Sequence, residues 1–247
     1  LSLQSFNVFA QTVVESSDGV SLTIKSSNRI ITIGGAVTET AYALGFGDNV
    51  VATDASSTYP RQVFQLPRVP YVRNLTAEGI LALAPDLILS SSDANPVSAI
   101  QQIRNAGTNM LLIKEQESLE GANNKLAVIG KALNAEEKAN ELIATNNTLF
   151  AKADSIKSTL NTSPKVMFVL AVNGTSNFMI AGKNTGAAKM IELAGGENAF
   201  NSYSGYKPTS IESIIAANAD YVLVMQSRID EISTGLKNTP GINSISA

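Results

Sequence analysis

The chain has 247 residues, 44% of them hydrophobic, which is enough for one large domain or two lobes with real cores. Its 18 basic and 21 acidic side chains leave a net charge of −3, so nothing in the charge favours nucleic acid as a partner. The absence of cysteine and histidine excludes disulfides, thiolate nucleophiles, and the most common metal ligand and general base.

The first predicted elements are a hairpin and then a parallel α/β alternation. The opening stretch, LSLQSFNVFAQ, fits either the tail of a cleaved export signal or an ordinary first strand. Residues 12–24 (TVVESSDGVSLTI) place two β-rich runs around an Asp-Gly turn, which predicts a hairpin. From Arg29, short β-branched runs alternate with helical segments (RIITI, AVTETAYALG, NVVATD), which predicts parallel α/β units.

Later elements divide the chain into two similar halves. Further helices are predicted over 75–85 and 96–106, and further strands over 86–89 (DLIL), 110–113 (MLLI) and 165–172 (KVMFVLAV). Helical spacing predicts one long helix over 135–160. The expected organisation is an N-terminal α/β lobe over 1–117, a helical connector over 118–161, and a C-terminal α/β lobe over 162–247. The predicted fold class is therefore α/β, with two Rossmann-like lobes joined by a single long helix and a ligand cleft between them.

An internal repeat supports this duplication. LGFGDNVV (44–51) aligns with LAGGENAF (193–200), 149 residues later, and EGILALAPDLIL (78–89) aligns with ESIIAANADYVL (212–223), 134 residues later. The first half therefore holds 15 extra residues between the two aligned segments. This insertion contains Tyr59 and Tyr71.

The stretch VPYVRNLTAEG (69–79) offers an iron-binding side chain in a chain without histidine. Tyrosine phenolate is a hard oxygen donor that suits ferric iron and is a known axial ligand of haem. In an extended segment residues i and i+2 point to the same side, so Arg73 can support a phenolate at Tyr71. The alternative is an exposed tyrosine–arginine contact with no ligand.

Three stretches resemble a known family: RIITIGGAVTETAYALGFGDNVVATDASSTYP, YVRNLTAEGILALAPDLIL and AGKNTGAAKMIELAGGENAF. They are similar to the haem-binding proteins that deliver haem to bacterial ABC importers, a branch of the helix-linked substrate-binding proteins. The resemblance runs from about Arg29 to Arg228. The Gly-Gly-x-x-Thr-Glu and Ala-Pro-Asp segments also occur in siderophore and cobalamin binders, whereas Tyr-x-Arg-x-Leu-x-Ala-Glu-Gly is typical of the haem branch.

The resemblance implies roles for individual residues. Tyr71 matches the tyrosine that ligates haem iron, Arg73 matches a basic residue that supports the tyrosinate, and Arg228 resembles an arginine facing the same pocket. Glu78 and Glu212 correspond to the two glutamates, one per lobe, that meet arginines of the permease. Their alternative role is a capping box at a helix start.

The chain also departs from the family. Some relatives carry a histidine near the position of Asn173 as a further haem ligand, so five-coordinate ligation by Tyr71 is expected here, with Asn173 or water opposite. Tyr59 is the rival ligand, because related cobalamin binders place an aromatic side chain near this position. Family members also continue beyond Ala247 through another strand and a closing helix.

The expected function is capture of ferric haem by a monomeric extracytoplasmic substrate-binding protein, with an ABC permease as partner and an outer-membrane haem receptor system upstream. The expected location is the periplasm, or a lipid-anchored extracytoplasmic site if a cysteine precedes the chain. A ferric siderophore or cobalamin is the alternative cargo. An enzyme using Asp54 or Glu39 is disfavoured, because single carboxylates after α/β strands usually cap helices or face solvent, and neither a GxSxG motif nor a phosphate loop occurs.

Overall fold

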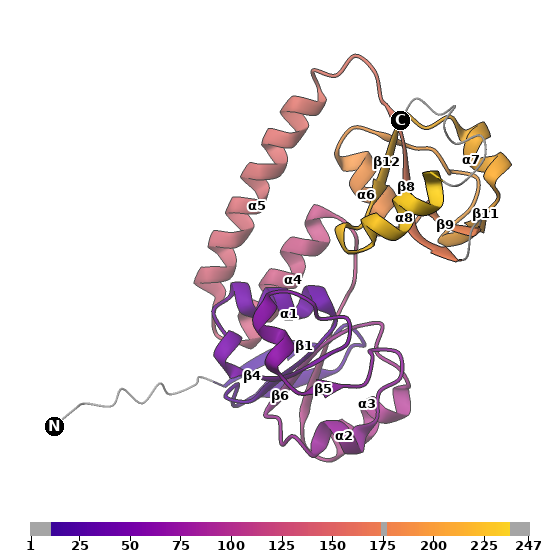
Figure 1. The fold of residues 1–247 in the computed structure, drawn as a ribbon. Helices are drawn as coiled ribbons and strands as arrows, with labels where there is room; N and C mark the ends of the chain where they lie inside the picture. Colours follow the sequence, from indigo (N-terminus) through magenta and orange to yellow (C-terminus); the bar gives the residue numbers. More distant parts are fainter. Residues whose placement is uncertain (1–10, 174–176, 238–247) are drawn as a thin grey trace. The chain divides into compact units, whose positions relative to one another are not determined.

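The computed structural model describes residues 11–173 and 177–237, in two compact units that meet in sequence between Asn147 and Thr148 (Figure 1). The predicted two-lobe α/β class is confirmed. The opening stretch predicted as export tail or strand, and the expected C-terminal continuation, lie outside the described residues.

Unit 1 holds a hairpin, a five-stranded sheet and the helices around it. In chain order its elements are β1 (Thr12–Glu15), β2 (Ser21–Ile24), β3 (Ile30–Ile33), α1 (Gly35–Ala43), β4 (Val50–Asp54), β5 (Arg68–Val69), α2 (Ala77–Leu81), β6 (Leu87–Ser91), α3 (Val97–Asn105), β7 (Asn109–Ile113), α4 (Leu119–Ala132) and α5 (Glu136–Lys157), with short 3-10 turns at Gly47–Asn49 and Arg61–Gln65. Helix α5 continues into unit 2. The predicted helix over 75–85 is shorter than expected, because Ala84 adopts a left-handed φ of 47° that stops it.

The sheet of unit 1 has the doubly wound arrangement. Its strand order is β5-β4-β3-β6-β7 and every pair is parallel. The order reverses between β3 and β6, so the carboxyl ends of all five strands form one edge with a topological switch point at its centre.

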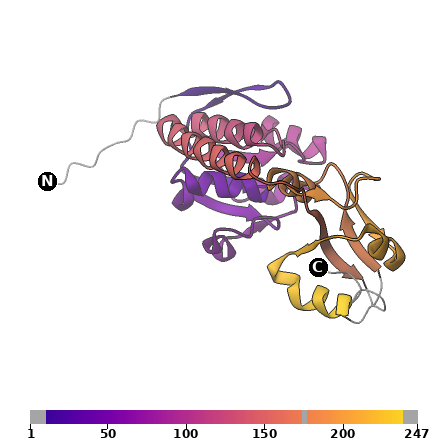
Figure 2. The same ribbon diagram turned by 90° about the horizontal axis from the view of Figure 1, so that it is seen from above.

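Helices cover both faces of this sheet (Figure 1). Alternate strand side chains such as Ile30 and Ile31 are fully buried on opposite faces. The face of Ile30 packs against α1, α4 and the hairpin, and the face of Ile31 packs against α2 and α3. The hairpin contacts α4 (Figure 2), so it adds a further layer to this unit.

Unit 2 repeats the pattern with a mixed sheet. Its elements after α5 are β8 (Lys165–Asn173), β9 (Asn177–Ala181), α6 (Gly186–Leu193), β10 (Glu197–Asn198), β11 (Tyr206–Thr209), α7 (Ile211–Ala217), β12 (Tyr221–Val224), a 3-10 turn (Gln226–Arg228) and α8 (Ile229–Lys237). Strands β10 and β12 lie parallel to β8, whereas β9 is antiparallel to β8 and to β11. Its core centres on Met167, Phe178, Ile180 and Ile214.

The same backbone clamp occurs in both units and supports the repeat. In unit 1, Asp86 accepts the Arg29 N–H at 3.1 Å through its carboxylate and donates its own N–H to Arg29 O at 2.9 Å. In unit 2, Asp220 accepts the Lys165 N–H at 2.7 Å and donates its N–H to Lys165 O at 2.8 Å. Each clamp aligns the first strand of a five-stranded sheet, β3 or β8, with a later parallel strand, β6 or β12. Asp86 and Asp220 are 134 residues apart, as the sequence alignment predicts.

The other predicted alignment, of 44–51 with 193–200, is wrong by one residue at the helix ends. Gly45 and Gly195 follow the C-caps of α1 and α6 with φ of 92° and 88°, and they are 150 residues apart. Only glycine adopts this conformation without steric cost, so the two glycines mark the equivalent positions.

Candidate functional site

The insertion of the first half lies at the carboxyl edge of the unit 1 sheet. It leaves β4 after Asp54, carries Tyr59, adds the short edge strand β5, and presents Tyr71 two residues after β5 ends. Ligands of doubly wound sheets bind beyond this edge, so the fold places the predicted tyrosines in the expected region.

A buried carboxylate fixes the start of the insertion. Asp54 is fully buried, and its carboxylate accepts the Gly34 N–H at 3.0 Å, the Ser56 hydroxyl at 2.8 and 2.9 Å, and the Ser57 hydroxyl at 3.0 Å. The Gly35 N–H donates to Ser56 Oγ at 3.1 Å. The Asp54 carboxylate therefore holds the loop and the start of α1. It is buried and fully hydrogen-bonded, so it is not exposed to act as a catalytic acid.

Arg68 fastens the far end of the same loop. Its Nη1 donates to Thr53 Oγ1 at 2.9 Å, to Asp54 O at 2.6 Å and to Ser57 O at 2.8 Å. Its guanidinium also lies 5.4 Å from the centroid of the Phe64 ring. With both ends held, the exposed Tyr59 is carried on a braced loop.

Tyr71 lies in a turn that is pinned to a neighbouring loop. The Asn74 N–H donates to Tyr71 O at 2.7 Å, the Asn95 N–H donates to Val72 O at 2.8 Å, and the Leu75 N–H donates to Asn95 O at 2.8 Å. The predicted extended conformation is therefore wrong, because these bonds fold the segment into a turn. Val72 and Leu75 are buried, whereas Tyr71 is 48% exposed and Arg73 is exposed, and that the two exposed side chains share one side stays a prediction.

Arg73 makes a close ion pair that the sequence analysis missed. Its Nη2 donates to Asp93 Oδ2 at 2.7 Å. The Asp93 carboxylate, through this hydrogen bond and its charge, raises the pKa of the Arg73 guanidinium. Tyr71 lies two residues before Arg73 in the same turn. The available signal was the position of Asp93 two residues beyond the buried strand β6, at the edge where β5 also ends.

The predicted site residues of unit 2 are less fully described. Arg228 ends a 3-10 turn and pairs with Glu231, Nη1 to Oε2, at 3.5 Å. Asn173 ends β8 opposite Asn177, and its side chain lies outside the described part of the chain. That Arg228 and Asn173 share a site with Tyr71 therefore stays a prediction.

The two predicted docking glutamates occupy matching positions. Glu78 is the second residue of α2 after the N-cap Thr76, and Glu212 is the second residue of α7 after the N-cap Ser210. Both are exposed. A capping box needs the glutamate at the third helical residue, so neither glutamate forms one, while a role at the helix start remains for Glu212, whose carboxylate accepts its own backbone N–H. The pKa of Glu212 is lowered by its own backbone N–H and by the Ser210 hydroxyl, so its carboxylate is ionised at neutral pH.

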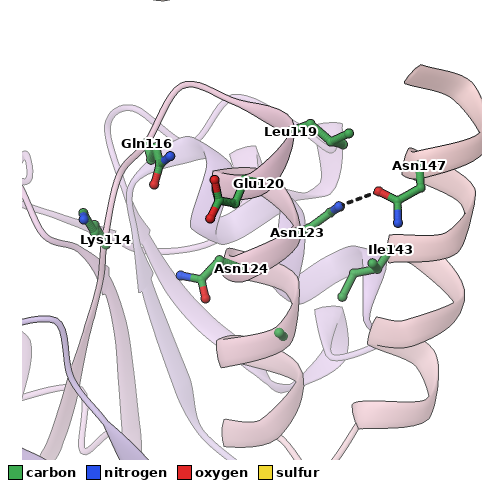
Figure 3. A pocket seen from close by; sticks show the side chains of 9 residues that line it. Lys114, Gln116, Leu119, Glu120, Asn123, Asn124, Ile143 and Asn147 are labelled. Carbon is green, nitrogen blue, oxygen red and sulfur yellow. Dashed lines mark hydrogen bonds between the residues drawn. The ribbon is translucent and has the colours of Figure 1, made fainter. Parts of the chain in front are cut away.

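A separate groove of about 710 Å³ lies between α4 and α5 in unit 1 (Figure 3). Its lining is mostly polar, and its amides bond to each other: Asn123 Nδ2 donates to Asn147 Oδ1 at 2.8 Å, and Asn146 Nδ2 donates to Asn123 Oδ1 at 3.1 Å. Figure 3 shows Lys114 and Gln116 on the opposite side from Ile143. The hydrogen bonds of Asn123 with Asn146 and Asn147 join α4 directly to α5.

Two kinds of feature are absent from the described residues. No helix within 11–173 and 177–237 is long and apolar enough to cross a membrane. Over the same residues, no three carboxylates gather closely enough to hold a metal ion.

A doubly wound α/β unit and its clamped repeat, linked in sequence through a 22-residue helix, define the class of two-lobe α/β substrate-binding proteins. The chain belongs to the periplasmic binding protein family, whose model matches residues 30–247. It is a substrate-binding protein of the kind that serves ABC importers.

The relatives whose names state a ligand fall into two groups, which bind heme or vitamin B12. The solved periplasmic heme-binding proteins BhuT, in complex with two hemes, and RhuT from Roseiflexus sp. RS-1 are each 34% identical, with TM-scores of 0.82 and 0.81, and each match covers 90% of this chain and 86% of the other. An uncharacterized ABC transporter substrate-binding lipoprotein, YvrC of Bacillus subtilis, is 27% identical over 89% of this chain and 70% of its own. The vitamin B12-binding protein of Vibrio parahaemolyticus is 25% identical over 82% of this chain and 72% of its own length.

Proposed function

We propose that this protein captures ferric haem outside the cytoplasm and delivers it to an ABC importer, with the Tyr71 phenolate as the iron ligand. The observation that carries the proposal is the pinned turn at the carboxyl edge, which holds the half-exposed Tyr71 and, two residues later, the exposed Arg73.

The chemistry of the pair suits a ferric ligand. A tyrosine phenol ordinarily has a pKa near 10, so a phenolate at neutral pH needs a metal ion or a cation to stabilise it. Ferric iron would be the metal ion, and the Arg73 guanidinium would be the cation. The bonds between Asn95 and the turn hold the backbone that carries Tyr71 in place before the ligand arrives, which lowers the entropy lost on binding.

The structural relatives favour haem, since the two at 34% identity are heme-binding proteins. The vitamin B12-binding relatives support cobalamin as the second candidate, with Tyr59 as the aromatic contact. Both cargoes contain a flat macrocycle, and the exposed Tyr59 ring on the braced loop would pack against it.

A hemin titration tests the proposal and separates the two tyrosines. Wild type is expected to bind one hemin per chain with the spectrum of a high-spin ferric tyrosinate, and Tyr71→Phe is expected to lose that spectrum. Tyr59→Phe is the matched control, because it removes one hydroxyl from the same insertion and should keep the spectrum. Hemin binding by Tyr71→Phe equal to wild type would reject the ligand, and retention of cyanocobalamin instead of hemin would reject the cargo.

Unit 2 is proposed to complete the site. Arg228 is assigned a contact with the haem periphery, and Asn173 or water the position opposite Tyr71. Arg228→Ala is expected to weaken hemin binding while keeping the tyrosinate spectrum, because the iron ligand is unchanged. Loss of that spectrum in Arg228→Ala would contradict this role.

Glu78 and Glu212 are proposed to dock the protein on its permease. They occupy matching helix positions in the two repeats, and a paired feature fits a two-fold transporter. Glu78→Lys and Glu212→Lys are expected to reduce haem uptake in reconstituted vesicles with hemin affinity unchanged, whereas the exposed Glu136→Lys should have no effect. The proposed location is the periplasm or a lipid-anchored extracytoplasmic site, with the protein acting as a monomer that receives haem from an outer-membrane receptor system.

A further inference from the structure

Asp93 and Arg73 form an ion pair whose two ends are anchored separately. The Asp93 N–H donates to Ser91 Oγ at 3.2 Å, at the end of the fully buried strand β6. Arg73 belongs to the turn of Tyr71, and its Nη2 lies 2.7 Å from Asp93 Oδ2. The pair therefore connects the end of the central strand β6 with the turn that follows the edge strand β5.

The backbone of the two loops sets the distance between these side chains. Asn95 donates to Val72 O and accepts from the Leu75 N–H, both at 2.8 Å, so the loops are joined on either side of Arg73. Val72, Leu75 and Ala94 are buried beneath them. Asp93 and Arg73 therefore face each other from one rigid pair of loops.

Without Asp93 the guanidinium has little to hold it. The Arg73 side chain is 65% exposed, and an exposed arginine samples many rotamers. The ion pair uses Nη2 and leaves Nε and Nη1 as donors for another acceptor. Tyr71 lies two residues before Arg73 in the same turn, which the bond from the Asn74 N–H to Tyr71 O closes at 2.7 Å.

We propose that Asp93 is a positioning residue that holds the Arg73 guanidinium beside the Tyr71 oxygen and thereby sets the strength of the iron–phenolate bond. This inference rests on haem ligation by Tyr71. Asp93 acts through Arg73 and makes no contact with the ligand of its own.

The test measures haem dissociation and the tyrosinate-to-iron charge-transfer band in the full chain loaded with hemin, with apomyoglobin as haem acceptor. Asp93→Ala is expected to raise the dissociation rate by roughly two- to fivefold, the range that one exposed ion pair supports. Its charge-transfer band is expected to move in the same direction as that of Arg73→Ala. Asp93→Asn keeps an acceptor oxygen in the same place, so its effect should be smaller. Glu141→Ala, which removes an exposed carboxylate from the Lys138 pair, is the control and should match wild type.

A double mutant identifies the route of the effect. In an Arg73→Ala background, Asp93→Ala should change neither the rate nor the band, because the residue through which it acts is gone. Additive effects of the two substitutions, or equal effects of Asp93→Asn and Asp93→Ala, would overturn the positioning role.

Failure of haem binding is distinguished by a measurement on the ligand-free protein. The Arg73 Nε–Hε group should give the nuclear relaxation of an ordered side chain in wild type and of a mobile one in Asp93→Ala. If wild type binds no hemin but this difference appears, the proposed function fails and the positioning of Arg73 stands. If the Arg73 group is equally mobile in both proteins, the positioning role is overturned whatever the cargo.

Discussion

Removing the Asp18–Arg104 ion pair should destabilise unit 1 in a pH-dependent way. Arg104 Nη1 lies 2.6 Å from Asp18 Oδ2, and Nη2 donates to Oδ1 at 3.2 Å, to Ser16 Oγ at 3.1 Å and to Met110 O at 2.8 Å. The pair therefore ties the turn of the N-terminal hairpin to α3 and β7. Asp18→Asn keeps the size of the side chain and removes its charge.

The size of the effect follows from the pKa of Asp18. Chiefly the Arg104 hydrogen bond lowers that pKa from 3.8 to about 2. At about 1.4 kcal/mol per pH unit the shift corresponds to roughly 2.5 kcal/mol, and because the Asp18 side chain is 36% exposed, screening reduces the expected loss to about 1 kcal/mol.

The sign of the pH dependence is fixed by the lowered pKa. The folded state holds the proton less tightly than the unfolded chain, so the stabilisation is complete above pH 3.8 and is lost as pH falls toward about 2. Urea unfolding should therefore show Asp18→Asn less stable than wild type at pH 7, with a difference that shrinks between pH 4 and pH 2.

The control is Glu141→Gln, which neutralises an exposed pair with Lys138 and should cost no more than about 0.5 kcal/mol. A difference for Asp18→Asn that is the same at pH 7 and pH 2.5, or is absent at pH 7, would refute the reasoning.

Four further substitutions test the packing of the two units by urea unfolding. Asp54→Ala should cost about 3 to 5 kcal/mol, because it leaves the buried Gly34 N–H and two hydroxyls without their acceptor, and a loss below 1 kcal/mol would contradict its anchoring role. Gly34→Ala should cost about 1 to 3 kcal/mol, since its φ is 105° and a Cβ would lie 3.1 Å from Ser91 Cβ, and a neutral result would show that the loop relaxes freely. Ile80→Ala and Ile214→Ala should each cost about 2 to 5 kcal/mol, because both are fully buried at equivalent repeat positions, and a large difference between them would contradict equivalent packing.

Much of the architecture is predictable, because the spacing of apolar residues and the residue types of turns are properties of short stretches of sequence. The hairpin of 12–24 has its Asp-Gly turn, and the strands from Ile30, Leu87 and Lys165 follow from short apolar runs. Matched Asp86 and Asp220 could be aligned from the sequence, and their clamps show what those two residues do.

Other features depend on contacts between distant segments. The turn of Tyr71 is imposed by Asn95, which lies 24 positions later in the chain and carries no local signal for the turn. The ion pair of Arg73 with Asp93 joins two loops that the sheet order brings together, so it follows from topology. The helix over 75–85 was overestimated because residues after Leu81 keep helical composition while Ala84 turns left-handed.

The Asp54 network changes what the first βα turn can recognise. In doubly wound proteins the backbone N–H groups where the first helix begins commonly receive a phosphate of the ligand. Here the N–H groups of Gly34 and Gly35 are already bonded to Asp54 and Ser56. The chain thus supplies its own anion at the place where a nucleotide would put one. On the proposed function, selection of the cargo falls to the side chains of the insertion, and a phosphate ester that enters this edge would meet a carboxylate.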